Sequence, residues 1–215
     1  MELISTVQIV ARCRYFQEGM KQLFNANEVS FRFIDSIDDL ILYENSPLIV
    51  LLAIDMSGAD SLKELKKSTD VLNQMPGPKK IGVLVSRYND YMTQYIYRKF
   101  KGGVTFFNAH NFHSGLFQRN FLSWLKGKTF RPMHVVSRYR DNRYGFSLKE
   151  WISLIMPLSG ETIPEIASNM GVRPSQIYQI RQNALKKIGI KSWREFCELY
   201  LLGEIRTENG RISIR

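Results

Sequence analysis

The sequence predicts an α/β domain built on a parallel sheet, followed by a smaller all-α domain. Three observations lead to this fold class. Apolar runs alternate with amphipathic stretches at first, an arginine-rich stretch without periodicity follows, and helix-start signatures then come in succession. The 215 residues suffice for two domains that each bury a core. The predicted parts are an α/β domain over 1–128, a basic linker over 129–145, a helical domain over 146–203 and a tail over 204–215.

Five apolar runs are candidate strands, and five amphipathic stretches are candidate helices. The strands are predicted at 6–11, 29–34, 48–54, 79–86 and 103–107. The helices are predicted near 15–25, 36–44, 61–73, 88–100 and 114–125. This alternation is typical of a parallel sheet covered on both faces, and the third run, LIVLLAI, is apolar throughout, as a central strand would be. We predict a flavodoxin-like doubly wound sheet with strand order 2-1-3-4-5.

The helical domain is predicted from paired capping residues. In an S/T-x-x-E pair the hydroxyl accepts a backbone N–H and the carboxylate reaches back to another. The pairs are Ser147 with Glu150, Thr162 with Glu165 and Ser192 with Glu195. With Pro174 at the first position of another helix, they predict helices over 148–158, 163–169, 175–188 and 193–202. Pro157 predicts an early end or a kink in the first of these.

The linker and the tail allow less specific expectations. Residues 128–145 combine arginines with tyrosines and lack periodicity, which favours a solvated linker; the alternative is a basic arm that touches the DNA backbone. In the tail, Asn209-Gly210 between short alternating runs predicts a hairpin, either docked on the body of the protein or frayed.

Composition narrows the partners and the compartment. The net charge is +10 and the sequence pI about 9.6, which suits a polyanion, either nucleic acid or anionic lipid, or serves solubility alone. Only Cys13 and Cys197 are present, so no disulfide framework is predicted and a reducing cytoplasm is expected. No signal peptide pattern appears and the longest apolar run is too short to span a bilayer, so no membrane association is expected.

Residues 160–190 predict a helix-turn-helix. Two short amphipathic patterns flank the break Gly-Val-Arg-Pro. Along the second pattern one face is apolar and the opposite face is polar. The apolar face is formed by Ile177, Ile180, Ala184 and Ile188. The polar face is formed by Ser175, Gln179, Gln182 and Lys186, flanked by Tyr178 and Asn183. This polar face would enter the major groove; the alternative is a solvated face of a four-helix bundle.

The polar residues suit DNA chemically. Glutamine amides can pair bidentately with adenine N6 and N7, whereas lysine and arginine supply charge to phosphate oxygens. Each good bidentate contact contributes about 1 to 3 kcal/mol of base discrimination. A single helix with two such contacts cannot select one genomic site, so a second DNA-binding subunit is expected.

The segment 146–190 resembles the DNA-binding domain of LuxR-type (FixJ/NarL) transcription regulators. FSLKE is similar to the family's L-[ST]-x-[RK]-E, EIA matches its E-I-A, and the run from Gln176 to Ile190 follows T-V-x-x-H-[RK]-x-N-I-x-x-K-L-G-V without a gap. The residues that agree outright are Arg181, Asn183, Lys187 and Gly189. The sequence departs from the family at Gln176, Ile180 and Ala184, so its DNA contacts are expected to differ.

The resemblance implies roles for individual residues. It places Tyr178, Gln179 and Gln182 at base edges. It places Ser175, Arg181, Lys186 and Lys187 at the DNA backbone, and Gln176 where the family has a backbone-contacting Thr. The last helix matches the dimerisation helix of the family, with some of its residues also filling the local core. The residues concerned are Trp193, Phe196, Cys197, Tyr200 and Leu201.

An α/β domain ahead of a LuxR-type domain resembles a response-regulator receiver. Receivers hold Mg²⁺ and accept phosphate with an acidic pair after the first strand and an Asp after the third, because that metal prefers carboxylate oxygens. Here Ala11 and Arg12 occupy the acidic pair, and Ala53 occupies the acceptor position, with Asp55 two residues late.

The other two receiver positions are altered as well. Phe107 stands where the receiver Lys is expected, and Val85 or Ser86 fills the hydroxyl position. We therefore predict a pseudo-receiver with no metal and no cofactor, which acts without phosphorylation. Some LuxR-type regulators with degenerate receivers are auxiliary heterodimer partners of other family members, in enterobacterial capsule and stress pathways.

The sequence thus predicts a cytoplasmic bacterial transcription regulator that binds double-stranded DNA as a homodimer, or as a heterodimer with another LuxR-type regulator. Two alternatives stay open: a protein that sequesters another regulator without its own operator, and a regulator whose N-terminal domain senses a small ligand. An enzyme is not expected, because His110, His113 and His134 show no metal-ligand spacing and no nucleophile or phosphate-loop motif is readable.

Overall fold

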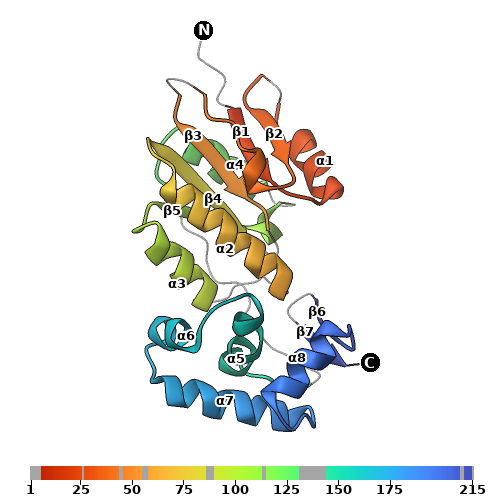
Figure 1. Ribbon diagram of the computed structural model, residues 1–215. Coiled ribbons are helices and arrows are strands. Elements are labelled where there is room, and N and C mark those ends of the chain that lie inside the picture. The colour runs from red at the N-terminus through yellow and green to blue at the C-terminus, as the bar shows by residue number, and fades with distance from the viewer. Residues whose placement is uncertain are drawn as a thin grey trace. The chain divides into compact units, whose positions relative to one another are not determined.

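The computed structural model forms two compact units (Figure 1). The residues that it describes are 6–25, 27–43, 46–54, 58–85, 90–112, 115–130, 144–208 and 211–214. The first unit comprises Met1–Ile54, Lys67–Ser86 and Tyr97–His134. The second unit comprises Asp55–Lys66, Arg87–Ile96 and Val135–Arg215. The linker and tail boundaries expected from the sequence stay predictions.

The first unit is built on a five-stranded parallel sheet. Its strands are β1 (Thr6–Val10), β2 (Ser30–Ile34), β3 (Leu48–Leu52), β4 (Lys79–Val85) and β5 (Val104–Asn108). Their order is β2-β1-β3-β4-β5, which confirms the predicted doubly wound topology. β3 is buried at every residue, as the continuous apolar run LIVLL predicts for a central strand covered on both faces.

The four helices connected with this sheet also match the sequence pattern. They are α1 (Arg14–Leu23), α2 (Ala59–Gln74), α3 (Asp90–Lys99) and α4 (Leu116–Leu125). A short 3-10 turn, η2 (Ala109–Asn111), leads from β5 toward α4. All four fall within a few residues of their predicted positions.

The helix predicted near 36–44 is wrong. That segment contains one 3-10 turn, η1 (Ile37–Asp39), and then continues without regular structure as far as Tyr43. The physical reason lies in β1, where the buried Gln8 donates from Nε2 to the Ile41 carbonyl at 2.6 Å and accepts the Ile41 N–H at 2.9 Å. This side chain satisfies both main-chain groups of Ile41, so the segment needs no helix to do so.

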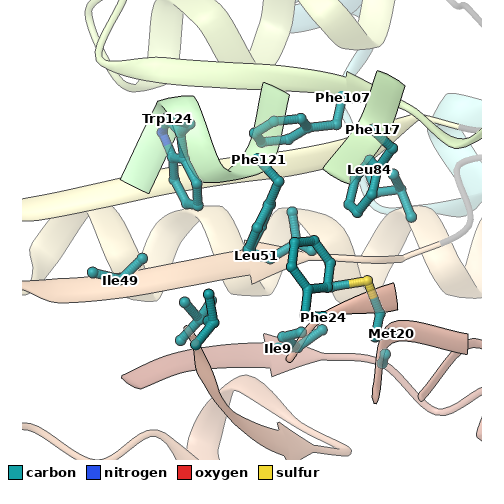
Figure 2. Packing of buried hydrophobic residues seen from close by; sticks show 13 residues of the cluster. Ile9, Met20, Phe24, Ile49, Leu51, Leu84, Phe107, Phe117, Phe121 and Trp124 are labelled. Carbon is teal, nitrogen blue, oxygen red and sulfur yellow. The ribbon is translucent and has the colours of Figure 1, made fainter. Parts of the chain in front are cut away.

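One face of the sheet carries an aromatic core (Figure 2). Alternate residues of β1, Val7 and Ile9, pack there against Met20 of α1, and the rings of α4 complete the layer. Those rings belong to Phe117, Phe121 and Trp124. Gly82 of β4 lies under them, since a Cβ at this position would come within 3.0 Å of Phe107 Cε2 and 3.2 Å of Trp124 Cη2. A larger residue at that position would require these neighbouring side chains to shift by a few tenths of an ångström.

The second unit holds the predicted helical domain. Its helices are α5 (Leu148–Leu158), α6 (Ile163–Met170), α7 (Pro174–Lys187) and α8 (Trp193–Leu201). They surround a core of fully buried side chains from all four helices. The largest contributions come from Trp151, Ile155, Ile166, Ile177, Leu185 and Phe196.

The predicted caps set the starts of these helices. Both halves of the capping box are present at Ser147 and at Thr162. In the third pair only the first of the two hydrogen bonds is as predicted. Ser192 Oγ accepts the Glu195 N–H at 3.1 Å, but the Glu195 carboxylate accepts the N–H of Lys191 at 2.9 Å in place of the Ser192 N–H. Each pair still satisfies two backbone donors at the helix start.

Pro157 does not end α5 early, so this part of the prediction is wrong. α5 continues to Leu158, and the Ser159 N–H bonds to the carbonyls of Ile155 and Met156 at 3.2 and 3.1 Å. Because Pro157 lies in the last turn, it removes a single helical hydrogen bond just before the helix would end.

The tail forms the predicted hairpin. β6 (Ile205–Glu208) pairs antiparallel with β7 (Arg211–Ile214), from Ile205 opposite Ile214 to Glu208 opposite Arg211. The Asn209-Gly210 turn itself lies outside the described residues. β6 packs against α8, and the side chains of Ile205 and Ile212 are buried, so the hairpin is docked rather than frayed.

Candidate nucleic-acid interface

The connection between α6 and α7 has the geometry of a helix-turn-helix. α6 ends at Gly171, whose left-handed φ of 65° allows the Val172 N–H to bond to the Ala167 carbonyl at 3.0 Å. Pro174 then occupies the first position of α7. The Gln176 carboxamide oxygen accepts the Arg173 N–H at 3.0 Å, so the residue that replaces the family's Thr also caps this helix.

One face of α7 is buried against the other helices. Ile177, Ala184 and Leu185 are fully buried, whereas Ile180 and Ile188 are only half-buried. The predicted apolar stripe is therefore right for Ile177 and Ala184 but omits Leu185. The spacing of four residues from Ile177 through Arg181 to Leu185 places all three on one face of the helix. This signal was missed because Arg181, in the middle of the series, is a polar residue.

The opposite face of α7 is exposed and polar. Tyr178 leaves about half of its surface to solvent (52%), and the carboxamides of Gln179 and Gln182 are exposed near it. The exposed polar residues of α7, in chain order, are Ser175, Gln176, Tyr178, Gln179, Gln182, Asn183, Lys186 and Lys187. The candidate base-reading residues thus share one surface of a helix whose position is fixed by the core.

Arg181 lies on the buried side of α7. It retains only 7% of its exposure, and its guanidinium carbon lies 5.1 Å from the centre of the Tyr178 ring and 4.5 Å from that of Trp193. Burial lowers the pKa of the Arg181 guanidinium below its ordinary value, and the interaction with Tyr178 opposes this shift. This geometry makes Arg181 a cation–π link between α7 and α8.

Lys187 is engaged by the start of α5. Its Nζ donates to the Gly145 carbonyl at 3.0 Å and to Glu150 Oε2 at 2.8 Å, and the same carboxylate accepts the Ser147 N–H at 2.8 Å. Burial alone would raise the pKa of Glu150, but the hydrogen bonds from Lys187 and Ser147 outweigh it and hold the pKa below 4.5. The C-terminal end of α7 is thereby held to the N-terminal cap of α5.

The residues of α8 divide between core and surface. Phe196 is fully buried, and the ring of Trp193 stacks on it at 5.3 Å between centroids. Cys197 and Tyr200 are half-buried. Leu201 and its neighbour Leu202 are the exposed apolar members, with 82% and 75% of their surface accessible. Among the predicted dimerisation residues, Leu201 is therefore the one most available to a second subunit.

Comparison with known proteins gives neighbours in structure only. No protein-family model matches the chain, and no curated protein matches it. Two RcsB dimers bound to two parallel DNAs resemble it at 15% identity and a TM-score of 0.47, over 93% of this chain and 98% of that chain. The RcsB–DNA complex is 16% identical, with a TM-score of 0.48, over 93% of this chain and 98% of that chain. The RcsB response regulator of Salmonella typhimurium is 19% identical, with a TM-score of 0.39, over 94% of this chain and 100% of that chain.

These solved neighbours are response regulators. At TM-scores below 0.5 the likeness assigns no activity to this chain. The functional argument accordingly rests on the residues themselves.

In the first unit, apolar side chains fill much of the edge where receivers carry their site. Ala11 is buried, and Ala53 packs against the aromatic core. Phe107 is almost fully buried, with its ring centre 5.4 Å from that of Trp124 and 5.8 Å from that of Phe130. Asp55 and Ser86, the two candidate remnants of the site, lie outside the described residues.

The histidines and cysteines named in the sequence analysis form no metal site in the part of the chain that the structure describes. Within those ranges, no group of three or more His, Cys, Asp or Glu residues is arranged so that it could hold a metal ion. The side chain of His110 lies outside them, as do His113, His134 and the arginines of residues 131–143. Cys13 and Cys197 are free thiols. No described helix is long and apolar enough to cross a membrane.

Proposed function

We propose that this chain is a bacterial DNA-binding transcription regulator whose α7 enters the major groove. The observation that carries the proposal is the exposed polar face of α7, on a helix fixed by a buried opposite face and by caps at both ends. A rigid helix with glutamine and lysine side chains on its open face has the chemistry to read base edges and to bind phosphate.

The roles follow from exposure. Three side chains are assigned to base edges, namely Tyr178, Gln179 and Gln182. Ser175 and Lys186 are assigned to phosphates, and Gln176 to the DNA backbone beside them. Arg181 and Lys187, which the family resemblance places at the DNA backbone, are assigned here to holding α7 in position. Their contacts with Trp193 and Glu150 support this assignment.

The regulator is proposed to act as a dimer in the cytoplasm, without phosphorylation. A single α7 offers too few base contacts for genomic selectivity, and the exposed Leu201 and Leu202 offer apolar surface to a second subunit. That subunit is either a second copy or another LuxR-type regulator. The apolar Ala11 and Phe107 at the receiver edge support independence from phosphate.

Fluorescence anisotropy against duplex DNA selected from a random library tests the proposal. Gln179→Ala with Gln182→Ala is expected to reduce discrimination between selected and scrambled duplex by about 1 to 3 kcal/mol per lost contact. Lys186→Ala should weaken both duplexes alike and lower the salt slope by about 1.

The matched control is Gln22→Ala with Gln74→Ala, which removes two exposed glutamines from α1 and α2. If this control and the α7 variant change DNA selectivity equally, the assignment of the reading face is wrong. If the wild-type chain binds no duplex alone but removes a second regulator from DNA, the chain is a sequestering protein instead.

A further inference from the structure

Tyr178 differs from the other side chains that we assign to base edges, because a series of ring contacts connects it to the core of the helical domain. The guanidinium carbon of Arg181 lies over the Tyr178 ring, 5.1 Å from its centre, and over the Trp193 ring, 4.5 Å from its centre. The Trp193 ring in turn stacks on Phe196, with 5.3 Å between centroids and 18° between the planes. We call these four residues, from Tyr178 through Arg181 and Trp193 to Phe196, the aromatic series.

The aromatic series runs from the core to the exposed face of α7. Phe196 is fully buried, Arg181 retains 7% of its exposure and Tyr178 retains 52%. Tyr178 and Arg181 are three positions apart on α7 and are therefore neighbours on the surface of that helix, whereas Trp193 is the first residue of α8. A residue of a different helix thus contributes, through Arg181, to the position of a side chain on the reading face.

Contact with a buried guanidinium restricts the Tyr178 ring before DNA is bound. A guanidinium group is planar and packs flat on aromatic faces, and a tyrosine side chain has only two rotatable angles to restrict. A side chain that is already held in its bound position loses less entropy when the complex forms. A ring held in one position also contacts one base pair along the groove rather than several, and discrimination between bases requires such a defined contact.

The chemistry of the ring indicates which base it contacts. Gln179 and Gln182 offer hydrogen-bonding carboxamides, whereas Tyr178 brings apolar ring carbons to the same face of α7. The base edges in the major groove present donors, acceptors and one apolar group, which is the C5-methyl of thymine. Apolar side chains recognise thymine through that methyl group. A fixed aromatic ring on the reading face therefore suits a thymine better than any other base.

We propose that Arg181 and Trp193 hold Tyr178 so that its ring contacts the C5-methyl of one thymine in the operator. Tyr178 is then a specificity-determining residue, and Arg181 and Trp193 are positioning residues that act through it. This inference rests on the proposed function, since it requires that α7 enters the major groove. It gives Trp193, a residue expected at the dimer interface, a role in base selection.

Fluorescence anisotropy with the full-length protein and the selected duplex tests this. Each thymidine is replaced in turn by deoxyuridine, which removes the C5-methyl and keeps the base pair. We expect one position at which this replacement weakens binding of the wild type by about fourfold, as the loss of one buried methyl contact requires. Tyr178→Ala should bind the thymidine and deoxyuridine duplexes equally at that position. The ratio of the two affinities is the thymine preference.

Two variants away from the base edge test the positioning. Arg181→Lys keeps a positive charge but loses the planar group, and Trp193→Leu loses the ring on α8. Both should lower the thymine preference below about twofold, whereas Trp193→Phe keeps a ring and should keep most of it. The preference compares two duplexes with the same protein preparation, so a smaller folded fraction weakens both affinities alike and leaves their ratio unchanged.

Ile166→Ala is the matched control, because it removes a fully buried side chain from α6 and should leave the thymine preference unchanged. An equal loss of preference in this control, or a full preference in both Arg181→Lys and Trp193→Leu, would overturn the positioning. If deoxyuridine has no effect on the wild type while Gln179→Ala with Gln182→Ala still loses discrimination, the thymine contact is wrong and the proposed function stands. A wild type that selects no duplex would overturn both.

Discussion

The helix-turn-helix and the receiver-like edge of the sheet differ in which residues of the regulator pattern they contain. The helix-turn-helix contains the residues that hold the fold, whereas the edge of the sheet lacks the charged groups of a receiver. In the C-terminal helices, three of the residues that match the LuxR-type pattern outright hold the fold. Arg181 packs on Trp193, Lys187 pairs with Glu150, and Gly189 takes a left-handed φ of 74° just past α7. The pattern on this side is thus largely structural, and the positions that we assign to base reading, which lie between these residues, are free to differ.

At the carboxyl edge of the sheet the fold remains but the chemical groups are replaced. Strand order and register are those of a doubly wound domain, yet a buried alanine and a buried phenylalanine occupy positions that would carry charge in a receiver. A parallel sheet is stabilised by its two apolar layers and does not depend on polar groups at its edge. The comparison distinguishes residues that stabilise a fold by packing from residues that carry out its chemistry.

The sharpest way to break this comparison is Phe107→Lys. Placing at this position the charge that a receiver carries should destabilise the first unit by about 3 to 5 kcal/mol, because the ammonium group would be buried among aromatic rings. Urea unfolding followed by circular dichroism measures the change in unfolding free energy. Phe107→Leu is the matched control and should cost about 1.5 kcal/mol or less. A Phe107→Lys protein as stable as the wild type would show that this edge has kept room for a working site.

Arg181→Ala examines the other side of the comparison. If Arg181 is a packing residue, its loss should reduce stability by about 2 to 3 kcal/mol, since the buried guanidinium contacts two rings. Thermal unfolding of the full-length chain reports this loss. Arg194→Ala is the control, because that side chain is exposed and pairs only with Glu198 along α8 in the contacts described. If the Arg181→Ala variant is as stable as the wild type and its DNA binding depends less steeply on salt, Arg181 contacts phosphate instead.

The smallest expected effect concerns pH. The folded pKa of Glu150 lies below its unfolded value, so its contribution to stability is present above about 4.5 and is lost as the pH falls through the folded pKa. Glu150→Gln keeps a side chain that suits the capping box but removes the charge on Lys187's partner. It should flatten the decline of stability between neutral and acid pH by about 1 kcal/mol or less, because Lys187 is partly exposed.

Unfolding curves at pH 7 and pH 4 provide this comparison, with Glu198→Gln on the surface of α8 as the control. A variant that loses stability on acidification as steeply as the wild type would mean that the ion pair does not link α7 to α5 energetically.

Sequence reasoning succeeded where the determining contacts are local. Ser147 and Thr162 cap helices through residues three positions away, and the strands follow from apolar runs read along the chain. The same holds for the hairpin, in which only two residues of the chain separate Glu208 from its partner Arg211.

It failed where the partner comes from elsewhere. The segment 36–44 has a helical pattern, but the carboxamide that fixes Ile41 belongs to a strand 33 positions earlier. For Arg181, which is predicted to contact the DNA backbone, a helical projection of α7 cannot show the ring of Trp193 on α8, 4.5 Å from its guanidinium carbon. Its contact with DNA stays a prediction.

The buried Gln8 has a consequence for hydrogen exchange in the segment after η1. Its carboxamide pairs with Ile41 as a neighbouring strand would, so the Ile41 amide hydrogen has a hydrogen-bond partner although it belongs to no helix or strand. We expect this hydrogen to exchange with solvent when the contact between Gln8 and Ile41 opens, so its exchange rate reports how firmly the segment is held to β1.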